Sequence, residues 1–301
     1  MNKIIFVVGP TATGKSALAI EIAKKLNGEI ISCDSMQIYK NMNIGTAKVT
    51  EAETGDIRHH LIDIVEANAF FDVSSYQKMA DSIINTITAK GKTPIIAGGT
   101  GLYVDSVLYP MSFAGKEKDD SLRNELKRFL EQYGKEALYD RLKNTDANAA
   151  ARLHVNDTKR IIRAIEIASG KPAESKVNEL IMPKYDYIMI GLNTERQSLY
   201  ERINQRVDKM FSSGLENEVR ALLENKLVDF DAQSMQAIGY KEFKPYFNNT
   251  LSIEEVAELI KKNSRHFAKR QLTWFKRYEK IKWFDCITER EKAVNYAVDN
   301  Y

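Results

Sequence analysis

Short apolar runs separated by amphipathic stretches dominate the hydrophobic pattern of this chain. The runs rich in Ile, Val and aromatic residues cover residues 4–8, 29–33, 93–97, 187–192 and 281–284. Runs of this length are typical of strands that are buried on both faces of a parallel sheet. Helical spacing of apolar residues covers residues 17–26, 72–89 and 195–211. The alternation predicts an α/β fold in which helices flank a parallel sheet.

Between residues 110 and 184 the pattern changes to helices without intervening strands. The helical candidates are residues 121–133, 135–143, 147–153 and 157–169. We therefore predict an all-helical insertion domain at 110–184, with residues 1–109 and 185–301 forming the two parts of the α/β core. An irregular stretch at 40–71 also stands out, and a long loop within a compact domain is more often functional than idle.

The first strand leads into a glycine-rich loop. Gly9, Gly14, Lys15 and Ser16 fit the G-x-x-x-x-G-K-[ST] pattern, between a strand and a helix. Glycines let the backbone curl so that its N–H groups face phosphate oxygens, and the helix N-terminus adds a positive end. Lys15 supplies a cation for the terminal phosphate, and the Ser16 hydroxyl is a natural Mg²⁺ ligand. The loop predicts a P-loop NTPase-like core that binds a nucleoside triphosphate or another diphosphate.

Asp34 and Thr100 each follow another predicted strand. Because the carboxyl ends of parallel strands line one edge of the sheet, both side chains should lie near Lys15. Asp34 could bind Mg²⁺, accept a proton or only cap a turn, since Asp is a common turn residue. The strand before Thr100 ends in Ala97-Gly98-Gly99 and lacks the acidic Mg²⁺ residue of a typical P-loop NTPase. This absence weakens the interpretation as an ATPase.

Composition narrows the class of protein. The net charge of +3 is too small to predict a nucleic-acid partner by itself. Cys33 and Cys286 are the two cysteines, which excludes a disulfide scaffold or a cysteine-based zinc finger and fits a reducing compartment. The adjacent His59 and His60 lack metal-ligand spacing, so a structural or substrate-shaping role is expected. With no long apolar segment for a signal peptide or a membrane span, we expect a cytoplasmic enzyme.

Basic residues gather in three helical stretches. Arg160 and Arg163 lie three apart, on one face of a helix of the insertion. Arg202 and Arg206 lie four apart beside the glycine-rich loop, where guanidinium groups suit a diphosphate. Residues 261–280 interleave Lys and Arg with aromatic residues, as nucleic-acid binding requires. Solvated helix surfaces, or an amphipathic helix with its aromatic side in the core, are the alternatives.

Seven stretches, taken together, resemble the bacterial tRNA dimethylallyltransferases, also called isopentenyl-diphosphate:tRNA transferases. They are GPTATGKS at 9–16, DSMQIY at 34–39, HHLID at 59–63, GGTGLY at 98–103, HVNDTKR at 154–160, GYKE at 239–242 and AKRQLTWF at 268–275. The stretches follow the order of that family and span nearly the whole chain. A glycine-rich loop alone would be a weak signal, whereas the ordered set is highly specific.

The resemblance implies transfer of a dimethylallyl group from dimethylallyl diphosphate to N6 of an adenosine in tRNA. The target in that family is the adenosine just 3′ of the anticodon, in tRNAs that read codons beginning with U. By the family's pattern Asp34 is the general base and Thr100 helps to place the adenine amine. The residues implied for the diphosphate and its Mg²⁺ are Gly9, Thr11, Ala12, Thr13, Gly14, Lys15, Ser16 and Arg206, with Ser16 as the metal ligand.

The resemblance also implies contacts with the anticodon stem-loop, which the insertion and the basic C-terminal helix would clasp. The implied residues are Asp34, Ser35, Met36, Gln37, Thr100, Arg123, Lys159, Arg160, Ile161, Ile162, Arg163, Gln236, Gly239, Tyr240, Lys241, Lys269, Arg270, Gln271, Trp274 and Lys276. Eukaryotic relatives carry a zinc finger, which two isolated cysteines do not suit, so the bacterial form is expected. A monomer without a membrane partner is expected as well.

Three other functions compete with this interpretation. An ATP-dependent kinase acting on a small molecule or nucleotide would need ATP and an acidic strand end. A non-catalytic tRNA-binding protein would keep the loop without its chemistry, and the intact set of Asp34, Thr100 and Lys15 argues against it. A related enzyme could transfer the same group to free adenine nucleotides. The long insertion and the basic run favour a macromolecular acceptor.

Overall fold

The computed structural model describes residues 3–111, 120–169 and 182–301, and the chain divides into two compact units. One unit comprises residues 1–110 and 182–301, and the other comprises 111–181. These borders lie close to those expected from the pattern at 109/110 and 184/185. The parts of the expected insertion at 112–119 and 170–181 lie outside the described residues. The two units are described separately below.

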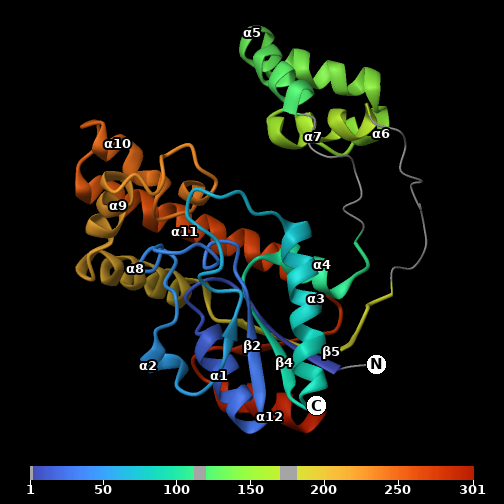
Figure 1. Ribbon diagram of the computed structural model, residues 1–301, viewed down its shortest axis with the longest axis vertical. Coiled ribbons are helices and arrows are strands. Elements are labelled where there is room, and N and C mark those ends of the chain that lie inside the picture. Colours follow the sequence, from blue (N-terminus) through green and yellow to red (C-terminus); the bar gives the residue numbers. More distant parts are fainter. Residues whose placement is uncertain (1–2, 112–119, 170–181) are drawn as a thin grey trace. The chain divides into compact units, whose positions relative to one another are not determined.

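A six-stranded parallel sheet forms the centre of the larger unit (Figure 1). In spatial order it contains β3 (His59–His60), β2 (Gly28–Cys33), β4 (Thr93–Gly98), β1 (Lys3–Val8), β5 (Asp186–Asn193) and β6 (Ile281–Asp285). Every pair is parallel, so the carboxyl ends of all strands meet at one edge. The predicted α/β class is confirmed. The short edge strand β3 was not predicted and lies within the irregular stretch.

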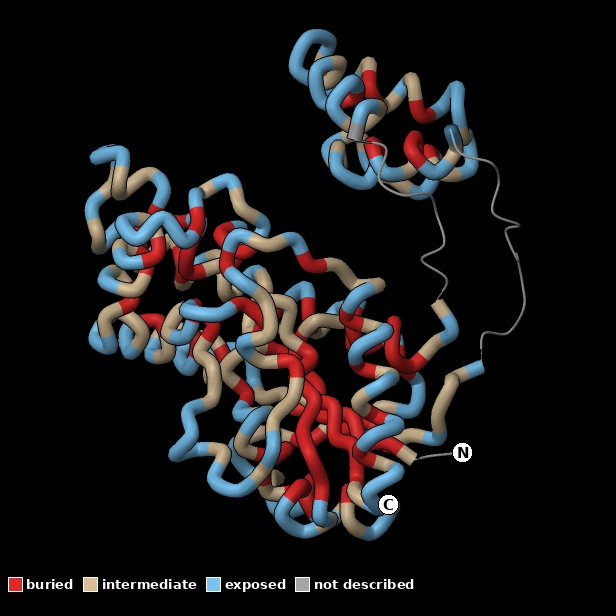
Figure 2. The backbone as a smooth tube through the Cα atoms, viewed as in Figure 1, coloured by how far each residue is buried: buried red, intermediate tan, exposed pale blue. Residues whose placement is uncertain are grey.

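Helices cover both faces of the sheet. The side chains of Ile5 and Val7 pack with α1 (Lys15–Lys25) and α12 (Arg290–Asn300) in one core. Ile4, Phe6 and Val8 join the opposite core, together with α3 (Val73–Ala89) and α4 (Gly101–Leu108). This alternation along β1 explains its uninterrupted apolar pattern, because every side chain is buried on one face or the other. Figure 2 shows the resulting buried centre.

A group of helices lies beyond one end of the sheet (Figure 1). It contains α8 (Arg196–Ser212), α9 (Leu215–Glu224), α10 (Lys244–Phe247) and α11 (Ile253–Phe275), with short 3₁₀ turns at Ser234–Gln236 and Lys241–Phe243. Helix α11 begins at a capping box formed by Ser252 and Glu255 and ends at Phe275. The basic run expected at 261–280 is therefore not a single helix, since its last residues form a turn before β6. Helices α9, α10 and α12 were not predicted.

The smaller unit is entirely helical in its described part. It contains α5 (Asp120–Thr145), α6 (Ala147–Ala150) and α7 (Thr158–Ala168). The backbone of α5 is broken at Gly134, where φ is 80°, which agrees with the two helices predicted on either side of that residue. The core contains side chains from all three helices: Leu126, Leu138, Leu142, Ala150, Ile161, Ile162 and Ile165.

The histidine pair has a structural role near the start of β2. His60 Nε2 lies 2.7 Å from Oε2 of Glu29, whose other oxygen accepts a 2.8 Å hydrogen bond from Lys92 Nζ. His59 Nδ1 lies 2.9 Å from the Ile57 carbonyl oxygen. Within residues 3–111, 120–169 and 182–301, no group of His, Cys, Asp and Glu side chains could hold a metal ion. His60 therefore joins the edge strand to β2, whereas the side chain of His59 contacts its own segment.

We predict that Glu29→Gln lowers the free energy of unfolding by about 2–3 kcal/mol at pH 7, because a buried ion pair loses one partner. Burial opposes ionisation of Glu29, but hydrogen bonds from Lys92 and His60 outweigh it and lower the pKa to about 2. This carboxylate therefore stabilises the fold above pH 4.5, and the contribution is lost as the pH falls towards 2.

Denaturant unfolding at pH 7, 5 and 3 checks this prediction. The difference between wild type and Glu29→Gln should shrink at pH 3. Glu66→Gln is the control, since Glu66 forms an exposed pair with Lys40 worth at most about 1 kcal/mol. Equal effects of the two substitutions at pH 7 would contradict the role of Glu29.

Candidate active site

The loop between β1 and α1 has the shape that binds phosphates. Gly9 has φ of 140°, and a Cβ there would lie 2.3 Å from the Leu192 carbonyl oxygen, so only glycine fits. The Thr13 side chain is buried and its hydroxyl donates to the Pro10 carbonyl oxygen at 2.9 Å. Gly9 and Thr13 therefore shape the loop. The other predicted loop residues line a cavity at the sheet edge: Thr11, Ala12, Gly14, Lys15 and Ser16.

Four cationic side chains line this cavity, which has a volume of about 660 Å³: Lys15, Lys48, Arg206 and Lys209. Lys15 Nζ donates to the Pro10 carbonyl oxygen at 2.6 Å. Burial and the nearby charge of Arg206 lower the pKa of Lys15 to about 7, although Asp34 acts in the opposite direction. Burial also lowers the pKa of Arg206, which reaches the cavity from α8. Two partly desolvated cations at one cavity are suited to an anion with several negative charges.

A second cavity, of about 260 Å³, adjoins the first. Five residues line both: Thr11, Asp34, Arg206, Met210 and Phe267. The shared residues combine the phosphate-binding loop, one carboxylate, one guanidinium and two apolar side chains. A molecule in one cavity can therefore meet a molecule in the other next to Asp34.

Thr100 connects the turn after β4 to the end of β2 and to the turn that carries Asp34. The Thr100 backbone N–H donates to the Cys33 carbonyl oxygen at 3.1 Å, and Thr100 Oγ1 accepts from the Ser35 N–H at 3.1 Å. Asp34 Oδ1 accepts from the Met36 N–H at 2.9 Å. The turn-capping role considered from the sequence is thus present. Asp34 also lines both cavities, at the boundary between them.

The missing acid at the end of β4 has a steric cause. A Cβ at Gly98 would lie 2.1 Å from the Cys33 carbonyl oxygen, so no side chain fits at that position. The larger cavity has two carboxylates among its described lining residues, Asp34 and Glu53. Glu53 is engaged in a capping box with Thr50. Asp34 is therefore the carboxylate available to a ligand near the glycine-rich loop.

Most of the predicted tRNA-contacting residues of the core lie around these cavities. Ser35, Met36, Thr100, Gln236, Gly239, Lys241 and Arg270 line the smaller cavity, and Gln37 lines the larger one. Lys269 and Lys276 are exposed, whereas Tyr240 is fully buried. Trp274 is half-buried and packs against Gly101. The side chain of Tyr240 therefore has no surface for a macromolecule, which corrects that prediction.

Gln271 also differs from the prediction. Its side chain is only 5% exposed and connects two loops of the site. Oε1 accepts from the Thr11 N–H at 2.9 Å, and Nε2 donates to the Gly99 carbonyl oxygen at 3.0 Å. Gln271 thus joins α11 to the glycine-rich loop and to the turn after β4, and it faces inward.

Only some of the predicted tRNA-contacting residues of the helical unit are exposed. Lys159 and Arg160 are exposed, whereas Ile161 and Ile162 are 0% and 7% exposed and pack in the core of the unit. The two isoleucine side chains cannot contact tRNA, which corrects that prediction. Arg123 donates to both carboxylate oxygens of Glu166, at 2.6 and 2.8 Å, and Arg163 donates to Oε2 of the same residue at 3.2 Å. These two arginines are therefore held by an internal carboxylate.

Several cavity residues were missed by the sequence analysis. Lys209 and Met210 follow Arg206 by one helical turn, so their spacing could have placed them beside it. The segment 43–50 carries no motif, and only its place in the irregular stretch pointed to it. Every residue of this segment lines one cavity or the other. We call residues 43–50 the wall segment.

Fold and site together define an α/β protein with a glycine-rich loop at the sheet edge and a carboxylate, Asp34, in the same cavity. The family model described as IPP transferase matches residues 37–278. The tRNA dimethylallyltransferase of Caldanaerobacter subterraneus is 51% identical over 288 residues, covering 94% of this chain and 91% of that protein. The chain therefore belongs to the IPP transferase family.

Solved structures agree with this membership. The tRNA isopentenylpyrophosphate transferase of Bacillus halodurans is 41% identical, with a TM-score of 0.75, covering 100% of this chain and 96% of that one. A eukaryotic dimethylallyltransferase acting on tRNA is 28% identical, with a TM-score of 0.84, covering 100% of this chain and 80% of that one. In the residues that the structure describes, no helix has the length and apolar character to cross a membrane.

We predict that binding of an anionic diphosphate takes up a proton at Lys15. Above pH 7 the ammonium of the free protein is largely deprotonated, and the bound anion raises its pKa again. Titration calorimetry with inorganic diphosphate at pH 8, in two buffers of different ionisation enthalpy, measures the uptake. Lys15→Met should lower uptake by nearly one proton and weaken binding about 10- to 100-fold. Equal proton uptake by both proteins would contradict this prediction.

We predict that Gln271→Leu lowers the free energy of unfolding by about 1–3 kcal/mol, because it leaves a buried N–H and a buried carbonyl without partners. Binding of inorganic diphosphate should weaken as well, since Thr11 lines both cavities. Thr273→Ala, on the exposed side of the same helix, is the control. Weaker tRNA binding with unchanged stability would instead support a direct contact of Gln271 with tRNA.

Proposed function

We propose that this protein transfers the dimethylallyl group of dimethylallyl diphosphate to N6 of the adenosine 3′ of the anticodon. The acceptors are tRNAs that read codons beginning with U, and the products are N6-(dimethylallyl)adenosine and diphosphate. One observation carries the proposal: Asp34 stands where a cavity lined by Lys15 and Arg206 adjoins a second cavity. Relatives named tRNA dimethylallyltransferase, at about half identity, support it.

The larger cavity suits the diphosphate donor. Lys15, Arg206 and the backbone N–H groups of the loop offer positive charge and donors to phosphate oxygens. Ser16 adds a hydroxyl oxygen at the same cavity, a ligand that suits Mg²⁺ as a hard cation. Ser16 would hold the ion, and its charge would neutralise part of the diphosphate when bound.

The reaction needs a base and stabilisation of a leaving group. The adenine amine is a weak nucleophile, so a carboxylate that takes its proton as the C–N bond forms should help about 10²- to 10⁴-fold. Asp34 has this role, and Thr100 holds the turn that carries Asp34 and places the amine. As the C–O bond breaks, its electron pair stays on the diphosphate. Lys15 and Arg206 stabilise that charge.

The smaller cavity suits an extruded base. Its lining combines Asp34 and Thr100 with apolar residues such as Met36 and Ile238. A loop adenine costs less to extrude than a paired one, which favours an anticodon loop over a duplex. Exposed cations on α7 and α11, among them Lys159, Arg160 and Lys269, would bind phosphates of the stem-loop.

An ATP-dependent kinase is the second candidate considered. Its Mg²⁺ would require a carboxylate at the end of β4, and the contact between Gly98 and Cys33 excludes one there. A diphosphate donor needs no hydrolytic water and tolerates that absence. We propose that the protein acts as a monomer in the cytoplasm, where its tRNA acceptor and two free thiols belong.

We predict that an anticodon stem-loop with adenosine 3′ of the anticodon gains one C₅H₈ unit when incubated with the protein, Mg²⁺ and dimethylallyl diphosphate, without ATP. Mass analysis of the nucleosides measures the gain. Asp34→Asn should lower turnover about 10²- to 10⁴-fold with tRNA affinity unchanged, because the proton acceptor is lost. The control acceptor carries guanosine at that position and should gain nothing. Activity that appears only with ATP would favour the kinase.

A further inference from the structure

The wall segment is part of both cavities but belongs to no helix or strand. Gly45 and Thr46 line the smaller cavity, and the other residues of the segment line the larger one. Its shape therefore determines how the two cavities open towards each other. An irregular segment keeps one shape only where the surrounding structure holds it.

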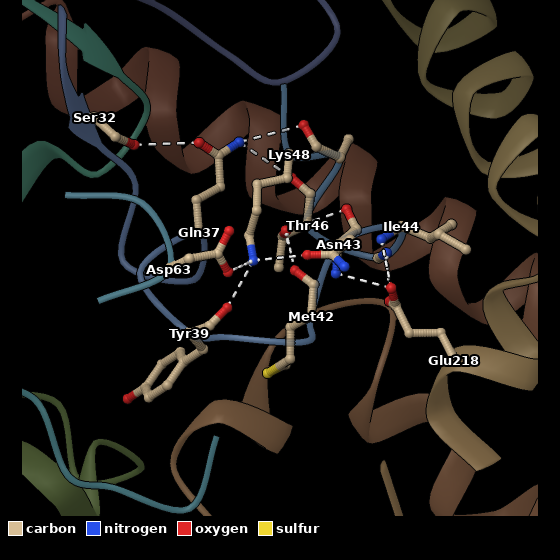
Figure 3. A network of polar contacts seen from close by, with 12 residues as sticks. Ser32, Gln37, Tyr39, Met42, Asn43, Ile44, Thr46, Lys48, Asp63 and Glu218 are labelled. Carbon is tan, nitrogen blue, oxygen red and sulfur yellow. Dashed lines mark hydrogen bonds and ion pairs between the residues drawn. The ribbon is translucent and has the colours of Figure 1, made fainter. Parts of the chain in front are cut away.

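Glu218 of α9 holds the beginning of the wall segment, as Figure 3 shows. Its Oε2 accepts from the N–H groups of Asn43 and Ile44, both at 2.8 Å, and Oε1 accepts from the Gly45 N–H at 3.1 Å. Successive backbone N–H groups turned to one side form a concavity that binds anions. Here the anion is a side chain of the protein, and hydrogen bonds to a charged acceptor are the stronger kind.

The same carboxylate also binds Tyr240, which packs against Gly45 of the wall segment. Tyr240 donates from its hydroxyl to Glu218 Oε1 at 2.6 Å, and its ring occupies the space where a Cβ of Gly45 would stand. The neighbours of Tyr240, Gly239 and Lys241, line the smaller cavity. Glu218 therefore fastens two segments that both line that cavity.

Residues 46–48 of the wall segment are held by other residues. Lys48 donates to the carbonyl oxygen of Tyr39 at 2.7 Å and also pairs with Asp63 (Figure 3). Gln37 donates to the carbonyl oxygens of Thr46 and Ala47, both at 3.3 Å. The N–H groups of Asn43 and Ile44 thus depend on Glu218, and the Gly45 N–H is shared between Glu218 and the Tyr240 hydroxyl. Glu218 itself lines neither cavity in the structure described.

We propose that Glu218 is a positioning residue for the transfer reaction, a role that rests on the proposed function. By holding the wall segment and residues 239–241 together, it makes donor and acceptor cavities meet at Asp34 in one arrangement. Losing it should misplace the two reactants relative to each other. A displacement of about 1 Å can lower turnover about 10²-fold.

The test compares Glu218→Ala and Glu218→Gln with Glu216→Ala. Glu216 is the matched control, because it lies on the same helix and accepts from Arg220 at 2.7 Å and from the Tyr246 hydroxyl at 2.9 Å. Hydrogen exchange of the amides at 43–45 and steady-state kinetics of dimethylallyl transfer are measured. Thermal unfolding and tRNA affinity report whether the rest of the protein is intact.

We expect both Glu218 variants to exchange the amides at 43–45 at least about 10-fold faster, since those N–H groups lose a charged acceptor. Turnover should fall about 10- to 100-fold and KM for the donor should rise, with tRNA affinity within about 3-fold of wild type. Glu216→Ala should match wild type within about 2-fold in both measurements. Glu218→Gln retains the size of the side chain and one acceptor oxygen, so it serves if the alanine variant unfolds.

Two results would overturn the role of Glu218. One is unchanged exchange at 43–45, which would show that the wall segment does not depend on the carboxylate. The other is faster exchange together with wild-type turnover and KM. A wild-type protein that transfers nothing would instead overturn the proposed function, and the exchange rates would still report whether Glu218 holds the segment.

Discussion

The close approach of β2 and β4 at their carboxyl ends is the constraint on which the candidate site depends. Gly98 stands against the Cys33 carbonyl group, and the Thr100 N–H closes the contact at 3.1 Å. Because β4 lies between β2 and β1, a side chain at its end would separate Asp34 from the glycine-rich loop. The bare glycines leave that space open. The contact therefore excludes an acidic side chain at Gly98 and leaves Asp34 exposed to the cavity beside the glycine-rich loop.

Burial and mutual repulsion disfavour the charged forms of Lys15 and Arg206 at this edge, and a bound diphosphate would favour them. Lys15 is held near a carbonyl oxygen, and its pKa of about 7 reflects burial and the charge of Arg206. Both groups are better stabilised with an anion between them than without one. Asp34 offsets part of this repulsion before the donor arrives. Lys15 and Arg206 therefore favour binding of the donor and also stabilise the charge that develops on the leaving group.

The predictable features were those encoded in contiguous residues. The strand at residues 4–8, the loop at 9–16 and the helix expected at 72–89 follow from local pattern and were found where expected. The kink at Gly134 likewise follows from one glycine between two helical patterns.

The missed features depend on contacts between distant parts of the chain. Gln271 meets Thr11 across 260 positions, and Glu218 meets Asn43 across 175, so neither role has a local signal. The family resemblance implied tRNA contacts for the whole stretch 159–163, but the helix turns Ile161 and Ile162 into the core of their unit. A motif marks a stretch of chain, and only the periodicity of the element decides which of its side chains face outward. The same periodicity leaves Lys159 and Arg160 exposed, where they can contact a phosphate backbone, although Arg160 also pairs with Asp157, and it buries the isoleucines that hold the helix in place.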